Sequence, residues 1–480
     1  MTSTLLALAA ATTVGFAVSR FFSRGLAPAE RAAWALASGL LIHAALYTAG
    51  ILLRLSPGPR KLLLAEAVIL AAVLLLRRRA RREDAPPSAS RDAREALRLP
   101  LLAAAAAGAL LFTLSALAEP IWATDFLAIW GLKAKTIFFA SGIPETLFRD
   151  PALAWSHPEY PLFLPLLFAS LAAFARDWND RALALLYPAL HLATILAAYG
   201  FLSRRVNRMA GAVAAALVGL FLPLYRAGHV GMADIPLAFG LVLLSCAFLD
   251  ARETSSPSVW VRLALASLFC AATKQEGLLY VVLLAATWLL ARRRVDSAGR
   301  AATTVALAAL LLPAALHWVV LRAAVGDLDH GDFDASLLLP DRWPELAGRA
   351  AEVASRLLSV EIAGAAVPVI AIALVLALTP RGRADLLLVP LIAQLVIYAG
   401  VASLSVYGAL WHAQASFART VAAIFPVAAI VLGARSGSLF AREGPGPRGP
   451  TSRASRSGHR LPERGPGIPL DERAGPRAEG

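Results

Sequence analysis

The chain has 480 residues, of which 58% are hydrophobic, and its mean hydropathy is +0.64. This composition excludes a soluble domain and predicts an all-α polytopic membrane protein, because each crossing takes about 20 apolar residues. The formal net charge of +14 comes from arginines that gather at segment ends and in the C-terminal tail, so it indicates membrane topology and not nucleic-acid binding.

The first quarter of the chain contains four apolar runs, near 3–22, 31–53, 62–76 and 99–117. The basic cluster at 77–82 follows the third run, so we expect it in the cytoplasm. The fourth run then returns to the outside. The arginines near the N-terminus follow the first apolar run, which favours a span entering from outside over a cleaved signal.

The first large external loop, 118–181, is expected to carry two interfacial helices. Its segment Asp125–Ala140 has apolar residues at helical spacing, with Lys133 and Lys135 near the edges of the stripe. The later run 162–175 is too short to cross comfortably. If it crossed, the basic pair Arg204-Arg205 would fall outside, so we expect an interfacial or re-entrant helix.

The remaining apolar runs alternate across the membrane and end in a basic tail. They lie near 182–202, 209–225, 234–250, 259–273, 277–291, 301–321, 361–378, 385–403 and 418–434. In total we predict about 13 transmembrane helices, with the N-terminus outside and the C-terminus inside. Residues 435–480 are rich in Gly, Pro, Ser and Arg and are predicted to be disordered. Cys246 and Cys270 lie in apolar runs, which indicates neither a disulfide framework nor a thiolate metal site.

This topology gathers the unusual polar residues on the external face. A charge at the bilayer centre costs roughly 2.5–3.5 kcal/mol, so several charges at span ends on one side indicate a shared aqueous cavity. The alternative is that span ends are simply where charge is tolerated. The residues are Asp125, His157, Glu159, His229, Asp234, Lys274, Glu276, the cluster Asp327–Asp334, His412 and Arg419.

Two acids stand at the outer entrances of helices. Asp125 opens the first interfacial helix and is a candidate general base, or a group that stabilises positive charge in the transition state. Asp234 opens the span at 234–250, with Pro236 in its first turn. Helix N-capping explains either acid equally well, and the two roles can coexist.

Two cations are candidates for binding a phosphate. Lys274 interrupts two apolar runs beside Glu276, although the two side chains could merely pair in a hairpin. Arg419 lies about two helical turns after His412, and arginine suits bidentate phosphate binding. The alternative there is a snorkelling arginine with Trp411 in an aromatic belt.

Other polar features have simpler interpretations. The cluster Asp327–Asp334 could hold a divalent cation, but it lacks the glycine and terminal glutamate of an EF-hand, and a solvated acidic loop is the alternative. His43, His191 and His317 lie within apolar runs, where packed histidines are expected and not ligands. The chain has no G-x-G-x-x-G, Walker, H-E-x-x-H or G-x-S-x-G motif, so nucleotide-driven transport and the common hydrolases find no support.

Over residues 99–300 the chain resembles the GT-C superfamily of membrane glycosyltransferases that use polyprenyl-phosphate sugars. The likeness is to the protein mannosyltransferase and lipid A aminoarabinose transferase type, glycosyltransferase family 39-like, with a weaker echo at His412–Pro426. The matching features are Asp125 in the external loop, Ser141-Gly142, His157-Pro158-Glu159-Tyr160-Pro161, Ala233-Asp234-Ile235-Pro236-Leu237 and Thr273-Lys274-Gln275-Glu276-Gly277.

The resemblance implies a hexosyl- or pentosyltransferase of the plasma (inner) membrane that inverts the sugar at the external face. Asp125 would match the family's loop acid and Asp234 its second external acid, whereas Lys274 and Arg419 could contact the carrier phosphate. The other expected substrate contacts are His157, Glu159, Tyr160, Glu276 and His412. The acceptor would be a glycan, a lipid or a protein. No cofactor is required, and a divalent cation is compatible with the chemistry.

The chain also departs from the family pattern. Some relatives have an acidic pair or Lys-Pro-Pro where this chain has Asp125-Phe126 and Ser156-His157-Pro158. His157 would replace that lysine only when protonated. The resemblance divides the chain into N-terminal helices and a basic linker (1–98), a catalytic module (99–300), C-terminal helices (301–434) and the tail (435–480). The rival functions are a transporter or flippase of lipid-linked saccharides, and an inactive relative that serves as an assembly subunit.

Overall fold

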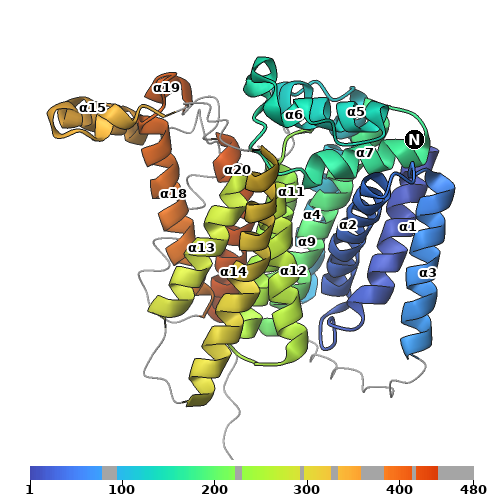
Figure 1. The fold of residues 1–480 in the computed structure, drawn as a ribbon. Helices are drawn as coiled ribbons and strands as arrows, with labels where there is room; N and C mark the ends of the chain where they lie inside the picture. The colour runs from blue at the N-terminus through green and yellow to red at the C-terminus, as the bar shows by residue number, and fades with distance from the viewer. Residues whose placement is uncertain are drawn as a thin grey trace, which may run out of the picture. The chain divides into compact units, whose positions relative to one another are not determined.

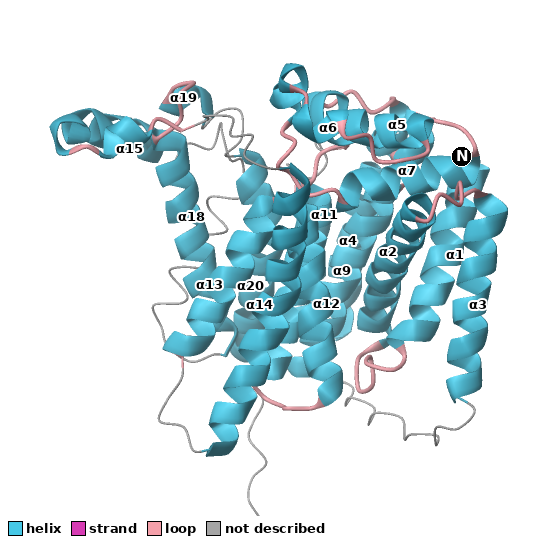
Figure 2. Ribbon diagram, viewed as in Figure 1, coloured by secondary structure: helices cyan, strands magenta, loops and turns pink. Residues whose placement is uncertain are grey.

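The elements that the structure describes are helices. The computed structural model describes residues 1–77, 95–221, 230–291, 297–325, 333–357, 383–412 and 418–441. Within these ranges there is no strand (Figure 2), apart from an isolated bridge between Phe333 and Ser405. The predicted all-α class is therefore confirmed. The long helices are α1 (Thr2–Ser19), α2 (Pro28–Leu52), α3 (Pro59–Arg77), α4 (Glu95–Ala118), α9 (Leu186–Arg205), α10 (Arg208–Leu220), α11 (Asp234–Ala251), α12 (Pro257–Thr273), α13 (Gln275–Leu290), α14 (Ser297–Val325), α18 (Leu388–Ser403) and α20 (Ala418–Ala441).

The composition and length of these helices are those of a multi-pass membrane protein. In the described part of the chain, eight helices are long and apolar enough to cross a membrane. Three shorter apolar helices, α10, α12 and α13, coincide with predicted spans. The total of about 13 spans and the identity of the membrane stay predictions. The predicted span at 361–378 lies outside the described residues.

The first large loop forms the helices that the sequence predicted. Its first segment is a π-helical turn, η1 (Phe126–Trp130), continued by α5 (Gly131–Ala140). In Figure 1, α5, the short α6 (Thr146–Arg149) and α7 (Phe163–Ala175) lie together over one end of the long helices. One detail was wrong. Lys133 is fully buried and does not lie at the edge of the apolar stripe.

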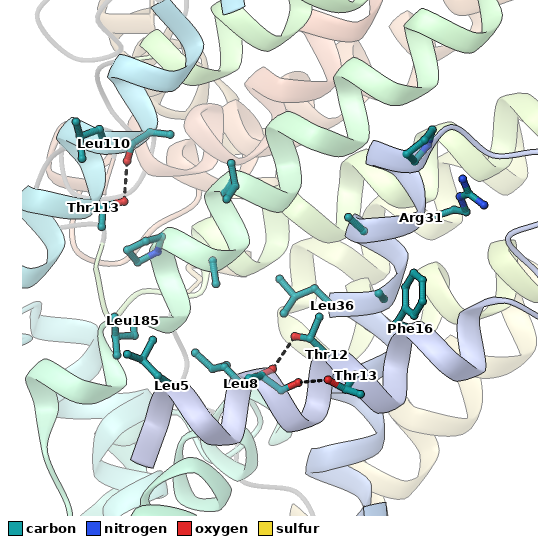
Figure 3. A pocket seen from close by; sticks show the side chains of 18 residues that line it. Leu5, Leu8, Thr12, Thr13, Phe16, Arg31, Leu36, Leu110, Thr113 and Leu185 are labelled. Atoms are coloured by element: carbon teal, nitrogen blue, oxygen red, sulfur yellow. Dashed lines mark hydrogen bonds between the residues drawn. The ribbon is translucent and has the colours of Figure 1, made fainter. Parts of the chain in front are cut away.

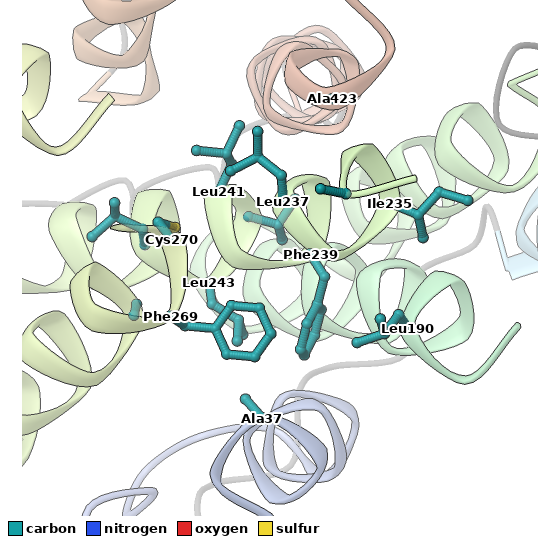
Figure 4. Close-up of a cluster of buried hydrophobic side chains, with 14 of the residues drawn as sticks. Ala37, Leu190, Ile235, Leu237, Phe239, Leu241, Leu243, Phe269, Cys270 and Ala423 are labelled. Carbon is teal, nitrogen blue, oxygen red and sulfur yellow. The ribbon is translucent and has the colours of Figure 1, made fainter. Parts of the chain in front are cut away.

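Two helices form the centre of the bundle. All residues of α11 are buried, and α20 is buried from Val421 to Leu432. Figure 4 shows α11 side chains between neighbouring helices, with Phe239 facing Phe269 of α12 edge to face at 5.6 Å between ring centroids. α11 begins with Asp234 and α20 begins near Arg419, and these two side chains are in contact. The central helices therefore start at the same end of the bundle.

A charged network closes the other end of α11. Asp250 accepts hydrogen bonds from Arg204 and Arg205 of α9 and from Arg262 of α12, and Arg204 also pairs with Glu30 of α2 at 2.7 Å. Asp234 and Asp250 are separated by about 24 Å along the helix. The Arg204-Arg205 pair and Asp234 thus lie at opposite ends, as the predicted topology requires. Which end is external stays a prediction.

The disordered tail was predicted to begin at Arg435, which is too early. α20 continues to Ala441, and Arg435 is held by Asp385, with 2.9 Å between Nε and Oδ1. This ion pair stabilises the last turns of a helix whose composition alone indicated disorder. The rest of the tail, from 442, lies outside the described residues. Cys246 and Cys270 are buried and free. His43 is buried with its Nδ1 2.7 Å from Glu66 Oε1, so the prediction of a packed, hydrogen-bonded histidine is confirmed there.

Candidate functional site

A glycine turn brings the two candidate acids into the same region. Gly231 precedes α11 with φ +99°, a backbone conformation that favours glycine. A Cβ atom there would lie 2.3 Å from Cγ2 of Ile121 and 2.8 Å from Cβ of Phe126. The turn that leads to Asp234 therefore packs directly on the segment that carries Asp125. Only a residue without a side chain permits this close approach.

Arg419 joins the two acids. Its Nη2 donates to Oδ2 of Asp125 at 2.6 Å and its Nη1 to Oδ1 at 3.3 Å, which is a bidentate pair. Its Nε donates to Oδ2 of Asp234 at 3.3 Å. The structure thus brings together three predicted site residues that are separated by up to 294 positions in the chain.

Helix capping does not explain either acid. Asp125 occupies the N-cap position of η1, but its side chain makes no capping hydrogen bond. Ala233 occupies the N-cap of α11, so Asp234 lies one residue inside the helix. Its carboxylate is in the first turn, where the helix dipole favours negative charge. Both carboxylates instead accept hydrogen bonds from cations of distant segments.

Lys274 adds a second cation to Asp234. It is the single extended residue between α12 and α13, with φ −159° and ψ 153°. Its Nζ lies 3.0 Å from Oδ1 of Asp234 and 2.7 Å from Oε1 of Glu276. The simple Lys–Glu pair considered from the sequence is therefore present, but Lys274 also binds an acid from another helix.

The five residues form an ion-pair network that we call the outer network: Asp125, Asp234, Lys274, Glu276 and Arg419. Three carboxylates face two cations, so one net negative charge remains when all are ionised. Asp234 and Lys274 form its buried layer, with 0% and 6% of the side chain exposed. The other three are 20–22% exposed. Both cations are therefore already paired with carboxylates.

Aromatic rings stack beside the outer network. The Tyr160 ring lies between Trp130 and His157, with centroid distances of 5.4 and 4.6 Å. His157 Nδ1 is 2.9 Å from Oε1 of Glu159, so these two predicted substrate contacts bind each other. Burial, with the Glu276 carboxylate adding to it, raises the pKa of Tyr160 well above its usual range. Its hydroxyl therefore stays protonated and can act as a hydrogen-bond donor.

Lys133 holds the backbone of His157 beside this aromatic stack, a role that the sequence did not predict. Its Nζ donates to the backbone carbonyl of His157. Burial lowers the pKa of Lys133 to about 7, although the Glu159 carboxylate acts in the opposite direction. The spacing of Phe126, Lys133 and Ile137 on one helical face could have indicated a buried lysine.

Three further polar residues surround the outer network and were also missed. Gln394 of α18 donates from Nε2 to the backbone carbonyl of Glu276 at 3.3 Å and to the hydroxyl of Tyr398. Tyr187 and Tyr398 are buried near Asp234. A lone amide within the apolar run 385–403 was the available signal for Gln394.

The remaining sequence candidates lie either outside the described residues or in the loop before α15. His412 ends the short α19 (Ala409–His412), and its side chain lies outside the described part, as do His229 and residues 327–332. Asp334 pairs with Arg342 at 3.1 Å in the loop that leads to α15 (Trp343–Leu357). Among the described residues, no group of three His, Cys, Asp or Glu side chains is arranged to hold a metal ion.

No protein-family model and no curated protein matches this chain. The functional interpretation therefore depends on the outer network and the residues around it.

Proposed function

We propose that the protein is a membrane glycosyltransferase that moves a sugar from a polyprenyl-phosphate carrier to an acceptor hydroxyl at the external face. The observation that carries this proposal is the shared guanidinium of Arg419, which holds Asp125 and Asp234 at one end of the bundle. Sugar transfer from such a carrier needs one base and one cationic phosphate site, and both residue types meet here.

Asp125 is the better placed of the two acids to act as the base. Its side chain is 20% exposed, whereas Asp234 is fully buried, so an acceptor can reach Asp125. The Asp125 carboxylate takes the proton of the acceptor hydroxyl as its oxygen attacks the anomeric carbon. The bond from that carbon to the carrier phosphate breaks, and the phosphate leaves with the bonding electrons. The anomeric configuration is inverted, and Asp125 later returns the proton to water.

Arg419 is the proposed site for the departing phosphate. It is partly exposed, and its Nη atoms suit bidentate contact with phosphate oxygens. Asp234 fixes Arg419 through Nε, which leaves the Nη atoms to exchange between Asp125 and the phosphate. Lys274 is buried between Asp234 and Glu276, so we assign it to holding Asp234 in position. Tyr160 is the proposed hydrogen-bond donor to the sugar.

The test is release of free polyprenyl phosphate by the purified full chain, supplied with polyprenyl-phosphate sugars and candidate acceptors. Asp125→Asn keeps the shape of the side chain and removes the base, so we expect the rate to fall by a factor of about 10²–10⁴. Glu119→Gln is the matched control, because Glu119 is an exposed acid of the same loop whose carboxylate accepts a hydrogen bond from Nε1 of Trp122. Its rate should equal that of the wild type.

Equal release by the wild type and Asp125→Asn would remove Asp125 from the mechanism. Movement of a labelled saccharide across proteoliposomes without release of free carrier would instead support the alternative, a transporter or flippase of lipid-linked saccharides. A transporter site is expected at mid-membrane, whereas the outer network lies at helix ends.

A further inference from the structure

A long groove opens between two pairs of helices, and none of the residues that line it belongs to the outer network. Its volume is about 1000 Å³, at the top of the range of about 300–1,000 Å³ for small-molecule sites. α1 and α2 form one wall, and α4 and α9 form the other (Figure 3). Along α1 the lining runs from Leu5 to Phe16, which is about 16 Å. This length matches one leaflet of a hydrocarbon core about 30 Å thick.

The helix packing explains why the groove is open. α1 and α2 approach closely at two glycines, since an added Cβ at Gly15 would lie 2.0 Å from the carbonyl oxygen of Ala35, and one at Gly39 2.2 Å from that of Ala11. α9 also approaches α2 at Gly200, where an added Cβ would lie 2.7 Å from the backbone nitrogen of Glu30. These contacts fix α1 against α2 and α2 against α9. In Figure 3, α1 and α4 stand on opposite sides of the space that remains.

Arg31 is the one charged residue that lines the groove. The other polar lining residues are threonines, and Thr12, Thr13 and Thr113 each donate to a carbonyl of their own helix. Among the described residues, no carboxylate pairs with Arg31, whereas its neighbour Glu30 is taken up by Arg204.

A second cation lies at the same end. The guanidinium carbon of Arg20 is 5.3 Å from the ring centroid of Phe16, which lines the groove. An apolar groove with cations at one end, and no lining acid, complements a molecule with apolar chains and an anionic head. Basic pockets between transmembrane helices bind such lipids.

We propose that this groove binds one anionic diacyl phospholipid, with its phosphate on Arg31 and its acyl chains between the α1–α2 and α4–α9 walls. The lipid belongs to the leaflet at the Arg204–Asp250 end of the bundle, because Arg31 follows Glu30 of that network. The inference is independent of the proposed sugar transfer.

Native mass spectrometry of the full chain tests the proposal. The protein is equilibrated in mixed micelles with equal amounts of phosphatidylglycerol and phosphatidylcholine, which share acyl chains and differ in net charge. The wild type should retain one phosphatidylglycerol in preference. Arg31→Gln should reduce this retention about fivefold, the effect of one basic residue at a membrane surface. Arg300→Gln, which changes an exposed arginine of α14 outside the groove, should not.

A second variant tests the apolar part of the site. Ala9 is exposed and lines the groove, so the indole of Ala9→Trp should occupy part of it and reduce lipid retention while Arg31 is unchanged. Equal retention of both lipids by the wild type would overturn the proposal. So would unchanged retention in Arg31→Gln, or a retained mass that corresponds to a polyprenyl phosphate.

Discussion

Replacing Asp234 by asparagine separates the buried layer of the outer network from its accessible layer. Asp234→Asn keeps the side-chain shape but removes the charge that faces both Lys274 and Arg419, at 3.0 and 3.3 Å. At an effective dielectric constant of 20, each contact corresponds to about 5 kcal/mol of Coulomb attraction. Burying a charged carboxylate costs desolvation free energy, and because the asparagine variant avoids this cost, much of the lost attraction is offset. Breaking a buried ion pair from one side typically costs about 3–5 kcal/mol, which is the loss we expect.

The same change at Asp125 should cost less. Asp125 and Arg419 are about one-fifth exposed, so water screens the pair and solvates Arg419 when its partner is lost. For Asp125→Asn we expect a loss of about 1.5–3 kcal/mol in the free energy of unfolding, the usual value of a hydrogen bond to a charged group. The loss in the free energy of unfolding should thus be larger for the variant in the buried layer than for the variant in the accessible layer.

Reversible unfolding in mixed detergent and SDS micelles, followed by tryptophan fluorescence, measures both losses. Glu119→Gln serves as the control and should stay within about 0.5 kcal/mol of the wild type, as surface changes do. If Asp234→Asn unfolds like this control, the buried carboxylate does not balance Lys274 and Arg419. A larger loss in Asp125→Asn than in Asp234→Asn would refute the assigned layers.

Three further predictions concern residues around the site and at the opposite end. Because burial lowers the pKa of Lys133 to about 7, the unfolded chain binds a proton above that pH that the folded chain does not. Stability should therefore rise with pH by up to about 1.4 kcal/mol per unit above pH 7, and Lys133→Met should flatten this rise in unfolding measured from pH 6 to 9. Gly231→Ala should lower the free energy of unfolding by at least about 1 kcal/mol, because alanine disfavours the positive φ at this position. The clash of the new Cβ with Ile121 should add to this loss, and a second substitution, Ile121→Ala, should recover part of the added loss. No recovery in the double variant would refute that contact. Asp250→Asn should lower the free energy of unfolding by about 3–5 kcal/mol and leave the rate of carrier release per folded molecule unchanged; a changed rate would link the two ends.

Hydropathy predicted most of the fold. The apolar runs at 31–53 and 234–250 correspond to α2 and α11 within a few residues, because a span must hide about 20 residues from water wherever it lies in the chain. Composition failed where tertiary contacts dominate. The Arg435–Asp385 pair extends α20 into a segment that looks disordered, and the fold buries Lys133, whose charge predicted an exposed edge.

For the candidate site, the sequence predicted only that its residues lie on the same face of the membrane. Arginine clusters placed Asp125, Asp234 and Arg419 on the same side, but they carry no information about which side chains touch. That pairing depends on the Gly231 turn against Ile121 and on two central helices that begin at the same end. Such contacts between distant segments come from packing, which residue spacing does not reveal.

The most direct measurement of the central claim is carrier-phosphate release by Asp125→Asn, Asp234→Asn and the double variant, each corrected for the folded fraction. Because Asp125 is the proposed base and Asp234 positions Arg419, each single variant should release carrier phosphate more slowly than the wild type, and the double variant should be slower than either. Full activity in Asp125→Asn, or a double variant as fast as Asp234→Asn alone, would contradict the account.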